Sequence, residues 1–167
     1  MWVKSLLIIL LFYISTAIQS SFFAHFNLWG GSINLVFIVF FTIVFFLKKE
    51  SYYQIIITAI IAGFFQDASS SSCPGLSIIM FSLIGASVKK IQYSLQEKKD
   101  NEFPLLYFAS LFLISLLVFK VVLKLCWTPA LSVGIFNEFF GSLILNLIFA
   151  LLVFIIYKKF FIKQSDV

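Results

Sequence analysis

Side chains able to do chemistry are few in this 167-residue sequence, and they do not cluster. There is one histidine, His25, and there are two cysteines, Cys73 and Cys126, with seven acidic residues spread along the chain. His25 has no second His or Cys at metal-ligand spacing, and no HExxH, GxSxG or glycine-rich phosphate loop is present. We therefore predict a protein that is not an enzyme, with no catalytic residue, metal or cofactor. We expect the cysteines to be unpaired thiols, with a disulfide as the alternative.

The most informative stretch runs from Ala59 through Gly63-Phe-Phe-Gln-Asp67 to Ser72-Cys-Pro-Gly-Leu76. Ala59 and Gly63 are four residues apart and so share one helix face, where small side chains let another helix approach closely. An acid at a helix C-terminus opposes the helix dipole, so helix stability does not explain Asp67. Asp67 either caps the next helix or contacts water, or it holds the turn through backbone N–H groups or pairs with a lysine.

The residues around Asp67 complete a predicted hairpin. Gln66 ends the first helix beside Asp67, and Pro74 suits the first turn of the next helix. Pro74 and Gly75 form a tight turn, and Leu76 follows it. Ser82 and Ala86 repeat the small-residue spacing on the second helix, and we expect these small faces to pack against a partner helix.

The amino-acid composition indicates what kind of structure positions these residues. The chain is 62% hydrophobic and 11% charged, with a mean hydropathy of +1.09, whereas soluble domains are about half apolar and about a quarter charged. Lipid must therefore be the solvent for most of the chain, because a transmembrane helix needs about 20 apolar residues. The prediction is an all-α membrane protein with one domain of six spans: 3–23, 28–47, 52–65, 74–91, 104–125 and 133–161.

The lysines predict the orientation of these spans. All 12 positive charges are lysines, the net charge is +5, and ten lysines fall on one predicted side. By the positive-inside rule that side is the cytoplasm, which places both termini there. Lysines at the ends of apolar runs indicate membrane topology and anionic lipid rather than nucleic acid. Residues 89–102 form the longest predicted cytoplasmic loop, either a solvated connection or a contact surface for a partner.

Lys120 and Lys124 are the two lysines on the other side. They are one helical turn apart and either snorkel to the interface or, in the case of Lys120, pair with Asp67 or Glu138. Asn146 lies about halfway along the sixth span, where we expect it to bond to another helix.

The segment Gly63-Phe-Phe-Gln-Asp67 with Ser72-Cys-Pro-Gly-Leu76, set between two apolar spans, resembles the hallmark hairpin of the rod shape-determining protein MreD family. The resemblance extends over the span order and loop lengths of nearly the whole chain, although Ile33-Asn34 replaces the Pro-Asp that the family often has before the second span.

The resemblance implies a multi-pass scaffold in the bacterial inner membrane. Such a protein acts with the bitopic protein MreC, with the actin-like MreB and with the elongation glycosyltransferase and transpeptidase of peptidoglycan synthesis. It also implies a fold similar to the six-helix substrate-binding subunits of energy-coupling-factor vitamin transporters. A vitamin-importer subunit is therefore the alternative function. The scarcity of buried acids argues against a small membrane enzyme or an ion channel.

Overall fold

Six helices form the described part of the protein, for which we use a computed structural model. The structure describes residues 2–23, 31–47, 52–70, 74–96, 104–127 and 135–159. The helices are α1 (Trp2–Ser21), α2 (Leu35–Phe46), α3 (Tyr52–Ser69), α4 (Leu76–Gln96), α5 (Pro104–Trp127) and α6 (Ile135–Tyr157). Each corresponds to one predicted apolar segment, so the all-helical fold class is confirmed for these residues.

The helix boundaries differ from the predicted spans in three places. α4 begins at Leu76 rather than Pro74 and continues to Gln96, so Lys89 lies in a helix and not in a loop. α3 extends to Ser69, beyond the predicted end at residue 65. α2 has only 12 residues, which is about 18 Å of helix and much less than the about 30 Å of a hydrocarbon core.

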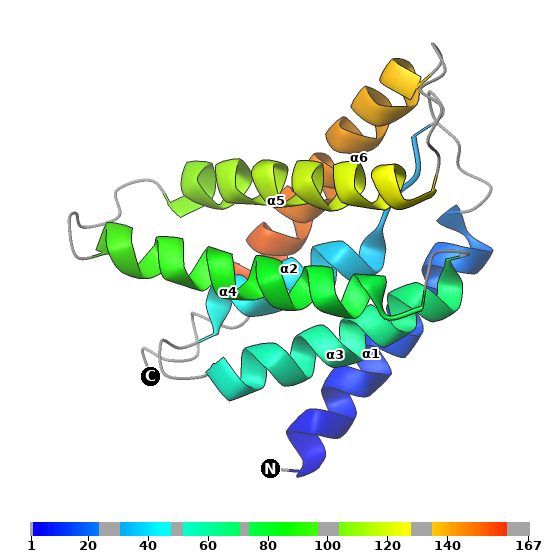
Figure 1. Cartoon of the computed structure of the whole chain (residues 1–167). Coiled ribbons are helices and arrows are strands. Elements are labelled where there is room, and N and C mark those ends of the chain that lie inside the picture. Colours follow the sequence, from blue (N-terminus) through cyan, green and yellow to red (C-terminus); the bar gives the residue numbers. More distant parts are fainter. Residues whose placement is uncertain are drawn as a thin grey trace.

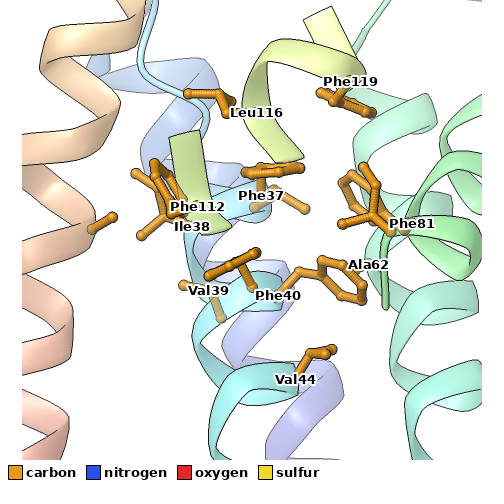
Figure 2. Packing of buried hydrophobic residues seen from close by; sticks show 14 of the residues in the cluster. Phe37, Ile38, Val39, Phe40, Val44, Ala62, Phe81, Phe112, Leu116 and Phe119 are labelled. Atoms are coloured by element: carbon orange, nitrogen blue, oxygen red, sulfur yellow. The ribbon is translucent and has the colours of Figure 1, made fainter. Parts of the chain in front are cut away.

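Short α2 is the centre of the bundle. Among the described residues it contacts each of the other five helices, and in Figure 1 it lies between α4 and α6 with the longer helices around it. Phe37, Phe40 and Phe41 are fully buried. Figure 2 shows Phe37 and Phe40 facing Phe81 of α4, and the Phe40 and Phe81 rings stack with centroids 4.6 Å apart. A helix that is apolar all round belongs in such an interior position.

The surrounding helices expose their outward faces. Leu106 of α5, Ile144 of α6 and Leu10 of α1 are all exposed although they are large and apolar, as expected for surfaces that contact lipid. Among the described residues, two helical segments are long and apolar enough to cross a membrane, Leu105–Cys126 and Phe139–Tyr157. Shorter apolar helices cover Leu6–Ser21 and Leu35–Phe46.

Candidate functional site

The α3–α4 hairpin is closed by Asp67. Its carboxylate accepts hydrogen bonds from the backbone N–H of Gly75 at 2.6 Å and of Ser77 at 3.2 Å. Gly75 has a φ of +89° and its carbonyl accepts from Ile79 N at 3.2 Å, so α4 starts immediately after it. Of the partners considered for Asp67, the structure shows the backbone N–H groups that begin the next helix. Pro74 lies in the turn before the helix, not in its first turn.

Gly63 lets the two helices of the hairpin touch. A Cβ at Gly63 would lie 2.5 Å from Ile78 Cα and 2.6 Å from Ile78 N, so even one methyl group would push α4 away. Gly85 also lies close to α3, but its Cβ would meet a side-chain atom, Ile55 Cγ2, at 2.7 Å. Ala59 is completely buried, so Ala59 and Gly63 face a helix of this chain, and the expectation that they face a partner helix is wrong for these two residues.

Two other hairpin residues contribute to the interior. Gln66 is only 5% exposed, and its Oε1 has no hydrogen-bond partner among the described residues. Ser77 Oγ is in the same situation. Leu76 is the first residue of α4 and packs, partly buried, against the hydrophobic core.

A second polar cluster, which we call the α2 entry network, surrounds the N-terminal end of α2. Asn146 of α6 is completely buried, and its Oδ1 accepts from Asn34 N at 2.7 Å. Its Nδ2 donates to Ser32 O at 2.9 Å and to Ser142 O at 2.7 Å. Asn34 Oδ1 in turn accepts from Phe37 N at 2.9 Å. The non-helical residues before α2 thus find their partners in protein, which backbone at membrane depth requires.

Lys120 joins this network rather than an ion pair. Its ammonium donates to Ser142 Oγ, whose own hydroxyl donates to Ser32 O at 2.7 Å. The expected pair with Asp67 does not form, since that carboxylate is used by the hairpin and the described parts of α3 and α5 make no contact. Glu138 lies in the first turn of α6, but its side chain is outside the described residues, so pairing with Glu138 stays a prediction.

Side chains from α1 and α4 complete the fastening of α2. Gln19 Oε1 accepts from Val36 N at 3.2 Å at the start of the helix. At its end, buried Lys89 donates to Leu47 O at 2.6 Å and to Phe45 O at 3.3 Å. Gln92 Nε2 also donates to Phe45 O, at 3.2 Å. Last-turn carbonyls lack partners within a helix and attract cations, so Lys89 acts as a C-terminal cap supplied by another helix.

Sequence reasoning missed Gln19, Ser32, Asn34, Lys89, Gln92 and Ser142. One usable signal was the helical spacing of Phe81, Ile84, Val88 and Gln92, which are all buried on one side of α4 in the structure. This spacing indicates that the helix and its core-facing side continue past residue 91. Asn34 was indicated locally as well, because Asn is a preferred N-cap residue and its side chain accepts from Phe37 N. Gln19, Ser32, Lys89 and Ser142 have partners from distant parts of the chain, which no local pattern could indicate.

The polar side chains of the hairpin and of the α2 entry network join separate elements of the chain to one another. Among the described residues no three His, Cys, Asp or Glu side chains gather as metal ligands would. Cys126 is an exposed free thiol, and Cys73 lies outside the described residues. The described residues thus form a helical protein whose interior polar groups bond to its own backbone, and two of its helices are long and apolar enough to cross a membrane.

The chain belongs to the rod shape-determining protein MreD family, whose model matches residues 2–163. It is therefore a member of a family of membrane proteins that determine cell shape, which is not a known enzyme family. No curated protein and no solved structure matches the chain. The expected likeness to energy-coupling-factor transporter subunits thus has no support from these comparisons.

Proposed function

We propose that the protein is a non-enzymatic scaffold of the machinery that elongates rod-shaped bacterial cells. In this proposal it crosses the inner membrane six times with both termini in the cytoplasm. It binds an MreC-like bitopic protein and so positions the elongation glycosyltransferase and transpeptidase, with MreB linked indirectly. The observation that carries the proposal is the family match over nearly the whole chain. The interior supports it, because Asp67, Lys89 and Asn146 each bond to a different element of the chain and so join the helices.

The partner helix has one favoured place. Around α2 the neighbours contact one another in the order α1, α3, α4, α5, α6, but α1 and α6 are not in helix-to-helix contact in the described parts of the chain. The residues just after α1 approach α6, since the rings of Phe23 and Phe149 have centroids 5.3 Å apart. We place a single transmembrane helix of the partner at this open side, where it would complete the ring around α2.

The two helices that flank the open side carry apolar residues toward it. Phe12 is buried, and the next residue, Tyr13, has its ring 6.4 Å from that of Phe65 of α3. Since successive helix residues are about 100° apart, Leu11 lies on the opposite flank of α1, away from α3. A stripe on that flank is exposed throughout, and it consists of Leu7, Leu11, Ile14 and Ile18. On α6, exposed Leu152 lies one turn beyond Phe149.

Photo-crosslinking in a rod-shaped host tests the proposal. A photoreactive amino acid replaces Leu11 or Leu152, and Ile114 on α5 is the matched control because it is also exposed. We expect crosslinks to an MreC-type protein from Leu11 and Leu152 and not from Ile114. Equal crosslinking from all three positions would contradict the open-side placement. If affinity purification in mild detergent recovers no MreC-type protein or wall synthase, the scaffold function itself is wrong.

A further inference from the structure

Two lysines near one end of α5 have no carboxylate partner among the side chains that the structure describes. Lys120 and Lys124 are one turn apart on one face of the helix. Counting from Cys126, where the span Leu105–Cys126 ends, they lie about 9 Å and about 3 Å below the end of the span at about 1.5 Å per residue. The described part of the chain contains no ion pair for either lysine. Within the described residues, two adjacent cations at this depth therefore face no carboxylate, and the side chain of Glu138 lies outside those residues.

The ammonium of Lys120 is held in place by buried groups. The hydroxyl hydrogen of Ser142 is donated to Ser32 O at 2.7 Å, so Ser142 Oγ faces Lys120 as an acceptor. Asn146 Nδ2 also donates to Ser142 Oγ, at 3.2 Å, and both Ser142 and Asn146 are buried. An ammonium has three N–H donors, and the structure shows a described acceptor for one of them. For the other two donors the described residues show no acceptor.

The surroundings of the two lysines are apolar and outward-facing. Leu117, Val121 and Leu125 are spaced four residues apart on α5, and all three are exposed. Both lysines are partly exposed beside this stripe. A ligand at this place meets two positive charges near the end of the span and hydrocarbon-compatible side chains alongside. That combination matches the phosphate and acyl chains of a phospholipid.

We propose that Lys120 and Lys124 form a binding site for the phosphate of an anionic lipid headgroup, in the membrane leaflet at this end of the bundle. Lysine binds phosphate as a point charge, and basic sites between transmembrane helices bind anionic headgroups. The exposed stripe of α5 receives the acyl chains. Bound lipid supplies a negative charge to the two lysines and links α5 to α6 through Ser142. The site does not depend on the scaffold function.

Native mass spectrometry of the purified full chain tests this site. The probes are phosphatidylglycerol and the zwitterionic phosphatidylcholine, offered in mixed micelles. We expect wild-type protein to retain phosphatidylglycerol preferentially, and retention to fall about fivefold for each lysine removed in Lys124→Met and in the double variant with Lys120→Met, as expected for about 1 kcal/mol per lysine. Lys124→Met leaves the Lys120–Ser142 bond intact, so the test does not depend on the double variant folding.

Controls separate a fixed site from general attraction. The exposed lysines at the other end of the bundle, Lys158 and Lys159, provide a double Met variant with the same loss of charge, and we expect near wild-type retention for it. An equal loss in that variant would show diffuse attraction and overturn the proposal. So would a rise in retention in Glu138→Gln, because the Glu138 carboxylate would then occupy the site. Displacement of the lipid by millimolar inorganic phosphate would overturn the assignment to a lipid headgroup.

Discussion

The α3–α4 hairpin and the α2 entry network both satisfy backbone groups with polar side chains, but over very different distances in sequence. Asp67 reaches amides 8 and 10 residues ahead. Asn146 reaches Ser32 and Asn34 across 114 and 112 residues. The hairpin is thus a local motif that can form before the rest of the bundle. The network can form only after α6 has packed against the segment before α2, so its hydrogen bonds are a property of the assembled bundle.

The two regions also differ in how many elements each links. Asp67 joins α3 to the start of α4, and loss of its carboxylate leaves the close packing at Gly63 intact. The entry network joins α5 and α6 to the segment before α2, which is the helix that every other helix contacts. We therefore expect substitutions in the network to reduce overall stability more than those in the hairpin.

Asn146→Leu should have the largest effect. It leaves Asn34 N without its acceptor and removes one of the two side-chain hydrogen bonds to Ser32 O, which together cost about 2–4 kcal/mol of unfolding free energy. Titration with a denaturing detergent in mixed micelles measures this. Ile148→Ala, on the exposed face of the same helix, serves as the control. A loss below about 0.5 kcal/mol, typical of surface substitutions, would show that the network does not stabilise the bundle.

Gly63→Ala comes next. The added methyl group would overlap Ile78 backbone atoms, so α3 and α4 must separate, at a cost of about 1–3 kcal/mol. Ala68→Leu adds more volume at an exposed position of the same helix and should leave the unfolding free energy nearly unchanged. If both variants are equally stable in the same titration, close helix approach at Gly63 is not required.

Asp67→Ala should cost about 1–2 kcal/mol, as for loss of a helix N-cap, since Gly75 N and Ser77 N lose their acceptor. Asp67→Asn retains one side-chain oxygen and should cost less. The unfolding free energy and the recovery of an MreC-type partner are both measured. Wild-type values of both quantities in both variants would show that Asp67 contributes neither to stability nor to partner binding.

Lys89→Met should have the smallest effect, a loss of about 1 kcal/mol or less. Two hydrogen bonds to the end of α2 disappear, but a buried charge disappears with them, and replacing such a charge by an apolar side chain is often nearly neutral. The neighbouring Lys90 is exposed, and Lys90→Met is the control in the same titration. A loss as large as that of Asn146→Leu would show that the contacts at the C-terminal end of α2 stabilise the bundle as much as the α2 entry network does.

Local sequence patterns predicted the features of the fold that depend on residues close to one another in the chain. Apolar length located all six helices, and the sequence around Asp67 predicted a tight turn, with backbone N–H groups as one of several partners considered for the carboxylate. The length of α2 was overestimated because a helix that is apolar on all sides has no periodicity to mark where it ends. The partners of Lys120 and Lys89 could not be predicted, since Ser142 and the carbonyls of Phe45 and Leu47 come near only after the helices pack.

The positions of the two chain ends test the central claim, a bundle that crosses the bilayer an even number of times with its lysine-rich end in the cytoplasm. Green fluorescent protein and alkaline phosphatase are fused in turn to the N-terminus and to the C-terminus in a bacterial host. We predict fluorescence and no phosphatase activity from both ends. Phosphatase activity from one end only would place the termini on opposite faces and contradict the six-span account.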